Sequence, residues 1–531
     1  MKNILKYTGA ALAAVSLLTA CTGAFEDMNT NPKGVTDDEL KQDNNFVGMH
    51  FLPMMQSIYF NKGNGNWEYQ LIQNLNADIF SGYMASGSNF AVSNNNMHYA
   101  LNHGWNDYCW NYAYNEVMSQ NLKAHNKCVA DMDTYAHFDA INTIIRVLTM
   151  SRLCDQYGPI IYSAYGQSMT GGTYDSGQDA YKQFFTELAA ADAALGEALK
   201  KSTASFANFD MAYGGDLAKW AKLANSLRLR LAIRIAKYDA AEAKKQAEAV
   251  VADANGLIKD NADNFTISST TYKHPLYAMT NSYHDILLNA NVSSILSGYK
   301  DARLEKMALP NEAGNLVGIR NGVDHLNDYT GQYKSLNIAS MLNVGEYTPV
   351  MLFSAAETYF LLAEAALRGW NVGGTAENFY TKGVQTSFEQ WGADMGSYLS
   401  SSNKPADFVD ALVPEYNHAA VETATPNWSD AKTDEERLEK IIVQKWIAVF
   451  PEGMNAWAEY RRTGYPKQFP IMRNDSQGDQ AIPTELGVRR LTYTESERDN
   501  NPTGYAGALQ KLGGSDTGAT RIFWDVDAPN L

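Results

Sequence analysis

One cysteine near the start of the chain has the sequence context of a thiol that accepts lipid. Two lysines come first, residues 9–18 are uncharged and apolar or small, and Leu-Thr-Ala-Cys follows at residues 18–21. A basic start, an apolar core and small residues before the cleavage point are typical of a secretory signal peptide. A cysteine directly after them matches the bacterial lipobox, in which the thiol is joined to diacylglycerol and then becomes the N-terminus. The sequence therefore predicts a signal peptide at 1–20 and lipidation at Cys21, with an ordinary signal peptide as the alternative.

The same segment indicates how the protein would be held at a membrane. A membrane-spanning helix needs about 20 apolar residues, and neither the leader nor any later segment is that long. Each buried CH₂ of an acyl chain contributes about 0.8 kcal/mol, so acyl groups on Cys21 would suffice as an anchor. Asp after the cysteine is typical of retention in the inner membrane, whereas Thr22 allows export to the outer membrane. Residues 21–40, which are turn-rich around 25–32, are predicted to be a tether.

A second set of residues has the chemistry of a carbohydrate-binding site. Aromatic faces stack on the C–H faces of sugar rings, and side-chain amides hydrogen-bond to hydroxyl groups. Residues 80–99 combine small, amide and aromatic side chains and are too polar for a core, and tyrosines recur among Asn, Ser and Gly in residues 264–347. The candidate ligand-binding residues are Tyr83, Asn89, Phe90, Asn95 and Tyr99 in the first segment and Tyr283, Tyr329 and Tyr333 in the second. The alternative is that most of the 31 tyrosines fill seams between helices.

The sequence lacks the motifs of common catalytic centres. It contains no His-Glu dipeptide, no GxSxG elbow, no Walker A loop and no GxGxxG fingerprint. A glycosidase needs two carboxylates that face each other across a cleft, and no motif indicates such a pair. Residues 475–479 are rich in oxygen ligands but lack the spacing of a known calcium loop. We therefore predict no enzyme activity, no cofactor and no metal site; a structural calcium ion would have no specific motif behind it.

Charge and cysteine content exclude two further classes of site. The net charge is −16, and removal of residues 1–20, which hold two lysines and no acidic residue, would take it to about −18. Because nucleic-acid binding depends on basic patches, we predict no nucleic-acid partner. Cys109, Cys128 and Cys154 lack metal-ligand spacing and are predicted to be small buried hydrophobes. A disulfide between Cys109 and Cys128 is the alternative.

Helical patterns dominate the chain that must position these groups. Apolar residues recur at helical spacing over 46–60, 67–83, 104–131, 137–157, 178–199, 217–237, 240–254, 354–368, 375–390, 434–450 and 453–462. Three sets read as helical hairpins of the tetratricopeptide type: 137–157 with 178–199, 216–237 with 240–254, and 354–368 with 375–390. The tail from Pro466 shows little periodicity and is predicted to lack helices of its own. We predict one all-α dominated body over 41–531, with long inserted loops.

Four segments resemble the SusD/RagB family of outer-membrane lipoproteins, in its SusD-like branch. The main one is DEERLEKIIVQKWIAVF at 434–450 followed by EGMNAWAEYRRTGYP at 452–466. The others are FEDMNTNP at 25–32, LCDQYGPIIYSA at 153–164 and WAKLANSLRLR at 220–230. These motifs read as structural: Arg461 or Arg462 would meet an acidic residue, and Arg228 and Arg230 would make buried or half-buried pairs.

The resemblance implies a scaffold, a location and a partner. The scaffold would be a tetratricopeptide-like α–α superhelix, lipid-anchored to the outer membrane and exposed at the cell surface. It would cap a SusC-like, TonB-dependent transporter, capture an oligosaccharide and deliver it. Peptide binding is the alternative, a glycoside hydrolase is a less favoured one, and the candidate loops would face the transporter if they do not face the ligand. The family's ligand residues vary between members, so none is carried over to this chain.

Overall fold

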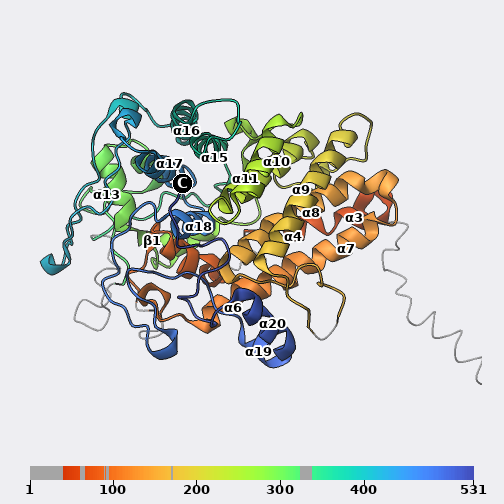
Figure 1. Cartoon of the computed structure of the whole chain (residues 1–531), viewed down its shortest axis with the longest axis horizontal. Coiled ribbons are helices and arrows are strands. Elements are labelled where there is room, and N and C mark those ends of the chain that lie inside the picture. Colours follow the sequence, from red (N-terminus) through yellow and green to blue (C-terminus); the bar gives the residue numbers. More distant parts are fainter. Residues whose placement is uncertain (1–39, 60–65, 89, 91–94, 169–170, 323–337) are drawn as a thin grey trace, which may run out of the picture. The chain divides into compact units, whose positions relative to one another are not determined.

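The computed structural model of the chain describes residues 40–59, 66–88, 90, 95–168, 171–322 and 338–531 (Figure 1). The chain divides into two compact units, Met1–Val47 and Gly48–Leu531. In the first unit the described residues form the short helix η1 (Gln42–Asn44) and the start of α3 (Asn45–Gly48). The leader, the tether with Cys21, and the candidate residues Asn89, Tyr329 and Tyr333 lie outside the described residues.

Helices form most of the second unit, which confirms the predicted all-α dominated class. In chain order the main helices are α4 (Phe51–Ser57), α5 (Asn66–Tyr69), the π-helix η3 (Gln70–Asp78), α6 (His103–Tyr112), the π-helix η5 (Ala113–Met118), α7 (Ser119–Cys128), α8 (Met132–Tyr157), α9 (Gly177–Ala198), α10 (Leu217–Arg234), α11 (Ala240–Ala252), α12 (Pro275–Tyr277), the π-helix η8 (Ala278–Ser282), α13 (Ala290–Tyr299), α14 (Leu304–Met307), α15 (Ala355–Leu367), α16 (Ala376–Trp391), α17 (Asp434–Ala448), α18 (Gly453–Thr463), α19 (Glu495–Asn500) and α20 (Pro502–Leu512).

The three predicted hairpins are present as packed helix pairs. Helix α8 packs against α9, α10 against α11 and α15 against α16, and α9 also packs against α10 (Figure 1). Polar side chains start these helices where the sequence predicts them: the Asp216 carboxylate accepts hydrogen bonds from the backbone N–H groups of Ala218 and Lys219, at 3.0 and 3.3 Å. Stacked hairpins of this kind bury their apolar stripes against neighbouring pairs, so the array supplies a continuous core.

Two small antiparallel ladders join segments that are far apart in the sequence. Strand β1 (Met84–Ala85) pairs with β3 (Leu287–Leu288), in the register Met84 to Leu288. Strand β2 (Phe265–Ile267) pairs with β4 (Val350–Phe353), with an irregularity between Phe265 and Thr266. The first ladder ties the two loop regions that hold the candidate ligand-binding residues to one another.

The C-terminal tail corrects one prediction, because it forms helices of its own. The N-cap Thr494 starts α19, and Asn501 starts α20 by accepting a hydrogen bond from the backbone N–H of Gly504 at 3.2 Å. Pro502 occupies the first position of α20, where its missing N–H leaves no intrahelical bond unmade and its fixed φ suits the helix. Pro502 therefore begins a helix in a tail that the sequence predicted to have none.

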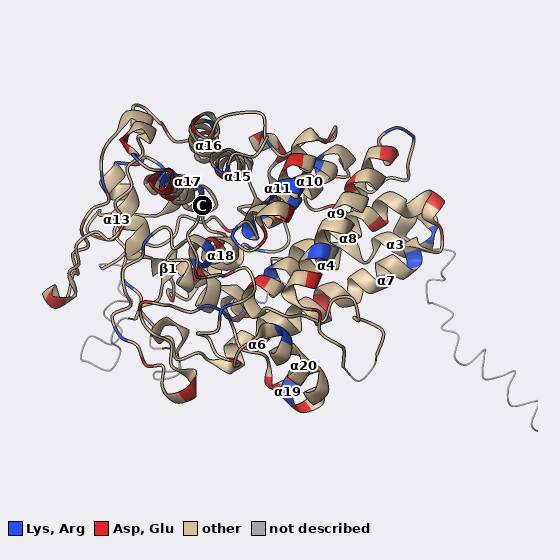
Figure 2. Cartoon of the chain, in the orientation of Figure 1, with Lys and Arg blue, Asp and Glu red and all other residues tan. Residues whose placement is uncertain are grey.

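A buried ionic network confirms the structural reading of the signature residues. Arg462 lies 2.6 Å from Glu364 and 2.5 Å from Glu459, and Arg230 lies 2.6 Å from Glu357. Arg234 links Glu459, at 3.2 Å, to Asp155, at 2.7 Å. Lys445 of α17 lies 3.3 Å from Glu459 of α18, and both helices carry basic and acidic residues (Figure 2).

This network draws three of the four resembling segments into one place. Asp155 comes from residues 153–164, Arg230 from residues 220–230, and both Glu459 and Arg462 come from residues 452–466. Their side chains are at most 9% exposed. Arg228, the other arginine of this segment that was predicted to make a pair, is half-buried. Its Nε donates to the Gln246 amide oxygen at 2.5 Å. The residues of the resembling segments thus hold together helices that are distant in the sequence.

Two further sequence predictions concern the cysteines and membrane-spanning helices. Cys109, Cys128 and Cys154 are buried free thiols, and burial raises their pKa values. The disulfide alternative is therefore not the state of this structure. Within the described part of the chain, no helix has both the length and the apolar character of a membrane span.

Candidate functional site

Helix α6 presents two aromatic side chains in succession. Trp105 and Tyr108 stand three residues apart, so they share one face of the helix. The Phe90 ring lies 6.0 Å from the Trp105 ring, at an interplanar angle of 86°. The Trp67 ring lies 5.6 Å from the Tyr108 ring, at 81°. The four side chains therefore follow one another as Phe90, Trp105, Tyr108 and Trp67, which we call the aromatic row.

The aromatic row is accessible, unlike most aromatic side chains of this protein. Trp67 is 48% exposed and is the only exposed tryptophan among the residues that the structure describes. Phe90, Trp105 and Tyr108 are half-buried. An edge-to-face arrangement holds each ring by its neighbour while leaving part of its surface free. A ledge of rings of this kind can stack against the C–H faces of consecutive sugar units.

Asparagine side chains fix the backbone that carries the row. The Asn95 amide donates to the Phe90 carbonyl oxygen at 2.8 Å, and its Oδ1 accepts from the backbone N–H of Met97 at 2.9 Å. Asn96 donates to Asn106 Oδ1 on α6 at 2.8 Å. Asn102 caps α6 by accepting from the backbone N–H of Trp105 at 3.3 Å. These bonds lock the turn before α6 to the helix itself, so the rings keep their spacing.

A second segment, which ends at a predicted residue, packs against the helix that carries Trp67. Helix α5, which carries Trp67, contacts both α12 and η8. Tyr283 follows η8 directly and is 38% exposed. The structure therefore brings a residue of the second candidate loop to the helix that ends the aromatic row.

Burial removes two of the predicted ligand-binding residues from the site. The Tyr83 side chain is fully buried between Trp446 and Phe450, and its hydroxyl donates to the Trp446 carbonyl oxygen. Asn95 is also fully buried and spends its amide on the backbone. In this segment Ser86, Asn95 and Asn96 each donate to a backbone carbonyl oxygen, so polarity there does not mark solvent contact at every position.

The other predicted residues fall into different places. Phe90 is the first member of the aromatic row. Tyr99 is half-buried, has a left-handed backbone with φ of 59°, and lines a small cavity of about 110 Å³ with Tyr460 and Gln468. Phe90 and Tyr283 thus stay candidates for ligand contact, and Tyr99 belongs to a separate hollow.

Three members of the row were missed by the sequence analysis. Trp105 and Tyr108 share an apolar-looking pattern with Tyr112, which predicted a core face. Their polar neighbours in the sequence could have distinguished Trp105 and Tyr108 from core residues. These neighbours are His103, Asn106 and Asp107, in the first two turns of α6. Trp67 stood inside a pattern predicted as one helix over 67–83, whereas α5 ends at Tyr69 and a π-helix follows.

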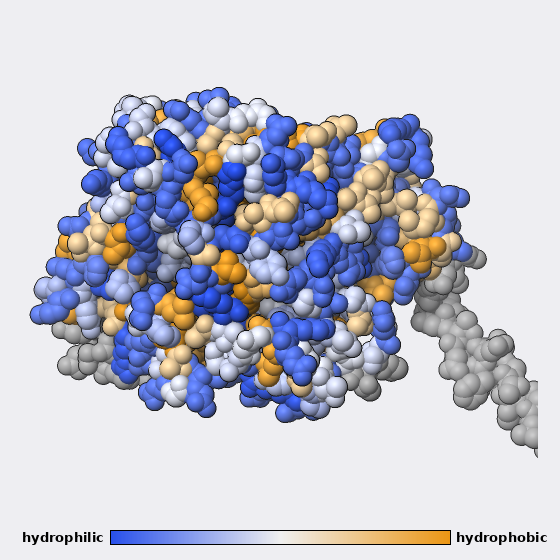
Figure 3. Space-filling view, viewed as in Figure 1, coloured by the Kyte–Doolittle hydropathy of each residue, from blue (hydrophilic) through white to orange (hydrophobic). Residues whose placement is uncertain are grey.

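The described residues contain no cluster of possible metal ligands. No group of three or more His, Cys, Asp or Glu side chains in the described ranges is placed to hold a metal ion. In the oxygen-rich segment 475–479, Asp475 Oδ1 accepts from Arg473 Nε at 2.7 Å. On the face drawn in Figure 3, hydrophobic residues form small groups among hydrophilic ones. The aromatic row is therefore the feature whose chemistry points most directly to a ligand.

A scaffold of helical hairpins that carries accessible aromatic side chains is typical of a ligand-binding protein. The sequence identifies the family. The profile of the SusD-like family, described as SusD and RagB outer-membrane lipoproteins, matches residues 27–525, and the chain belongs to this family. The members of this family are binding proteins of the outer membrane.

Solved structures of SusD homologues share the whole fold. A chitin-binding SusD homologue from Flavobacterium johnsoniae is 41% identical, with a TM-score of 0.87, and the match covers 91% of this chain and 100% of that one. A SusD homologue from Bacteroides vulgatus is 37% identical, with a TM-score of 0.87, and covers 93% and 100%. One from Bacteroides thetaiotaomicron is 30% identical, with a TM-score of 0.82, and covers 91% and 99%. No curated protein sequence matches the chain.

Proposed function

We propose that this protein is a cell-surface lipoprotein that captures an oligosaccharide on the aromatic row and delivers it to a SusC-like, TonB-dependent transporter. The observation that carries the proposal is the row itself, in which four aromatic side chains stand side by side and Trp67 is 48% exposed. Rings at this spacing offer successive stacking faces to a chain of sugars. In this proposal the row only binds the sugar, and no catalytic step takes place on it.

The choice of a first ligand follows from the relatives. The homologue from Flavobacterium johnsoniae, at 41% identity, is described as chitin-binding. We therefore take chitohexaose, a hexamer of N-acetylglucosamine, as the oligosaccharide probe. A glycan array on the lipid-free chain from residue 22 would show whether this or another glycan binds, and a peptide array on the same protein tests the alternative ligand class.

The binding experiment compares a row variant with a matched control. Titration calorimetry of the hexasaccharide probe should give weaker binding for Trp67→Ala. The control is Trp428→Ala, which removes a half-buried tryptophan packed on Tyr380, at a ring distance of 5.1 Å, outside the row. Equal affinity of the wild type and Trp67→Ala would contradict ligand capture on the row. Release of shortened sugars by the pure protein would contradict the view that it only binds.

The anchor and the partner need tests in cells. Replacement of Cys21 by Ala should move the protein from the membrane fraction to the soluble fraction, because the lipid would no longer be attached. Protease added to intact cells should degrade the wild-type protein if it is exposed at the surface. Affinity purification of the wild type from detergent-solubilised outer membrane should recover a transporter of the TonB-dependent class. Recovery of the protein without any such barrel would contradict the delivery step.

A further inference from the structure

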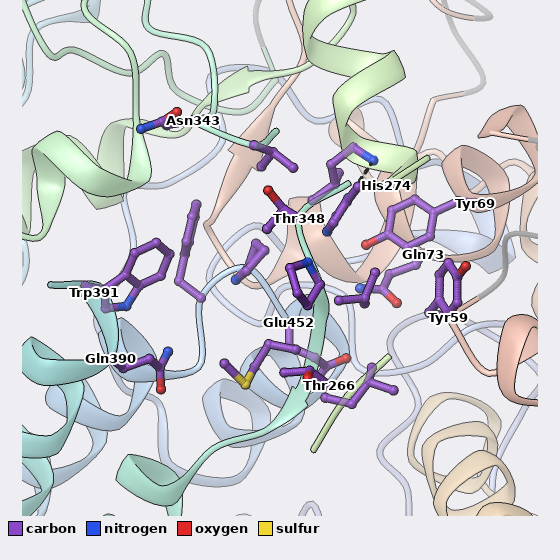
Figure 4. Close-up of a pocket in the computed structure, with 18 residues that line it drawn as sticks. Tyr59, Tyr69, Gln73, Thr266, His274, Asn343, Thr348, Gln390, Trp391 and Glu452 are labelled. Carbon is purple, nitrogen blue, oxygen red and sulfur yellow. Dashed lines mark hydrogen bonds between the residues drawn. The ribbon is translucent and has the colours of Figure 1, made fainter. Parts of the chain in front are cut away.

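A separate pocket is lined in part by Tyr69 of α5, the helix that carries Trp67. Its volume is about 280 Å³, close to the lower end of the roughly 300–1,000 Å³ range of small-molecule sites. It is lined by residues of η3, β2, α12, β4, the end of α16 and the turn between α17 and α18 (Figure 4). None of its lining residues belongs to the aromatic row. The pocket is therefore a second place where this chain could hold a ligand.

The pocket wall is mostly apolar. Leu276, Val350, Met351, Leu352 and Phe450 contribute much of it. Walls of this kind favour a ligand with an apolar body and few polar atoms, because each polar group that is buried without a partner costs free energy. A ligand that is polar all round would lose its hydration here without replacement.

Several polar groups on the wall are already satisfied inside the protein. The Gln73 amide donates to Asp78 at 3.0 Å, and its oxygen accepts from Arg152 at 3.1 Å. Glu452 accepts from Arg152 at 2.7 Å and from the backbone N–H of Asn455 at 2.9 Å. His274 Nδ1 accepts from the backbone N–H of Leu276 at 3.2 Å. These groups shape the pocket and have little hydrogen-bonding capacity left for a ligand.

Two polar atoms on the wall are different. Gln390 Oε1 and Trp391 Nε1 are both buried and both lack a hydrogen-bond partner, and they are the only atoms of the pocket lining with this property among the described residues. Gln390 and Trp391 close α16 and lie together at one end of the pocket, away from Tyr59 and Tyr69 (Figure 4). A buried unpaired group costs about 1–3 kcal/mol. The pocket therefore has one acceptor and one donor that lack partners, on neighbouring residues at the end of α16.

The charge of the pocket also restricts the ligand. Burial lowers the pKa of His274 to about 4, so this side chain is neutral at pH 7. The Glu452 carboxylate is paired with the Arg152 guanidinium at 2.7 Å. An ionised ligand would meet no unpaired opposite charge on these groups and would pay for its desolvation. The pocket therefore favours an uncharged molecule.

We propose that this pocket binds an uncharged small molecule in which a secondary amide is attached to an apolar group. The ligand carbonyl would accept from Trp391 Nε1, and the ligand N–H would donate to Gln390 Oε1. Two sources offer this chemistry: the acetamido group of an amino sugar, and a peptide group beside an apolar side chain. This inference goes beyond capture on the aromatic row and does not depend on it, since the two sites share no residue.

The test follows the indole N–H of Trp391 directly. ¹H–¹⁵N correlation spectra of the lipid-free chain contain indole signals, and the signal that disappears in Trp391→Phe belongs to Trp391. We expect this signal to shift saturably when N-acetyl-L-leucinamide or N-acetylglucosamine is added. The two probes separate the two sources, because they carry the same amide on different bodies. Binding of either supports the proposal and assigns the source.

Variants make the assignment specific. Trp391→Phe and Gln390→Leu keep the apolar wall and remove one hydrogen bond each, so the affinity of the binding probe should fall about tenfold, with little change in the melting temperature. Trp428→Phe removes an indole outside the pocket and should leave the affinity unchanged. Because the affinity is read from the Trp391 signal, failure of this proposal is distinguishable from failure of ligand capture on the aromatic row.

The proposal is overturned by either of two results. One is that the Trp391 signal does not move with either probe up to solubility. The other is that Trp391→Phe and Gln390→Leu bind a probe as tightly as the wild type does. Loss of binding in Trp67→Ala alone would instead assign the probe to the aromatic row.

Discussion

The ionic network and the aromatic row are both built from conspicuous residue types, but they have opposite relations to solvent. Arg462 and Glu364 in the network are at most 1% exposed, whereas Trp67 in the row is 48% exposed. The network joins α8, α10, α15 and α18, whereas the row stands on α5, α6 and the segment at Phe90. The comparison separates buried ion pairs that hold the helices together from the exposed rings on which we propose that the ligand binds.

The charged residues of the network depend on one another, as the pKa values of its acidic members show. Burial alone would raise the pKa of Glu364 and Glu459, but the guanidinium of Arg462 holds both pKa values below their ordinary range. The charges of Arg234 and Lys445 act on Glu459 in the same direction. Each ion is tolerated only because its partners are present, so no member can change alone without leaving a buried charge.

The largest effect should follow from breaking the network. Arg462→Ala leaves Glu364 and Glu459 buried with fewer partners, and we expect the free energy of unfolding to fall by roughly 3–5 kcal/mol. Chemical denaturation would measure it. The control is Lys182→Ala, whose partner Asp179 lies 3.7 Å away with both side chains exposed, and which should cost at most about 1 kcal/mol. Equal losses would mean that burial of the network does not set its strength.

The pH dependence of stability should carry a contribution from His274 in the second pocket. Its pKa is about 4 in the folded chain, below the usual 6.5, because the side chain is buried and its Nδ1 accepts a hydrogen bond. The unfolded chain therefore binds the proton more tightly, and this contribution is fully present above pH 6.5 and is lost as the pH falls towards 4. The loss should reach about 3 kcal/mol.

His274→Asn tests this contribution while keeping a residue that caps α12. Unfolding free energies of the wild type and the variant should be measured between pH 7 and pH 4. We expect the variant to lose less stability over this range. Parallel curves would show that His274 does not titrate differently in the folded and unfolded chains.

Removal of one ring from the row should cost binding and leave the fold intact. Trp67→Ala should weaken binding of the hexasaccharide probe by about 30-fold, or roughly 2 kcal/mol, as expected for loss of an aromatic side chain that carries much of the binding energy. The melting temperature should change little because Trp67 is 48% exposed. If the variant loses as much free energy of unfolding as free energy of binding, Trp67 is a structural residue. That result would contradict the contrast between the row and the network.

The smallest effect should come from a buried tyrosine that the sequence predicted as a ligand contact. Tyr83→Phe removes only the hydroxyl that donates to the Trp446 carbonyl oxygen. We expect a loss of about 1 kcal/mol in the free energy of unfolding. Affinity for the hexasaccharide probe should stay the same. Weaker sugar binding in this variant would return Tyr83 to the site.

The scaffold could be predicted from the sequence because its signals are local and periodic. Apolar residues at helical spacing, with Asp216 as an N-cap, located the hairpins to within a few residues. The helices of the tail were missed because Pro502 can either end a helix or begin one, and only the capping contact of Asn501 decides between these roles. Pairing of Arg230 and Arg462 with acids was predictable, but the identity of the acids depends on packing between distant helices.

The candidate site was less predictable, because exposure depends on packing between segments. Tyr83 and Phe90 stand in the same polar segment, yet one is fully buried and the other joins the row. Composition cannot separate them, since each aromatic residue suits a core as well as a sugar. The unpaired atoms of Gln390 and Trp391 had no sequence signal at all, because a missing hydrogen bond becomes visible only when every neighbour has been placed.

The central claim is that ligand capture belongs to the aromatic row and not to the residues that define the family. Titration calorimetry of the hexasaccharide probe into the wild type and into a Trp67→Ala, Tyr108→Ala double variant tests it most directly. The account predicts a loss of affinity of about 100-fold or more in the double variant, with an unchanged melting temperature. Wild-type affinity in a folded double variant would contradict it.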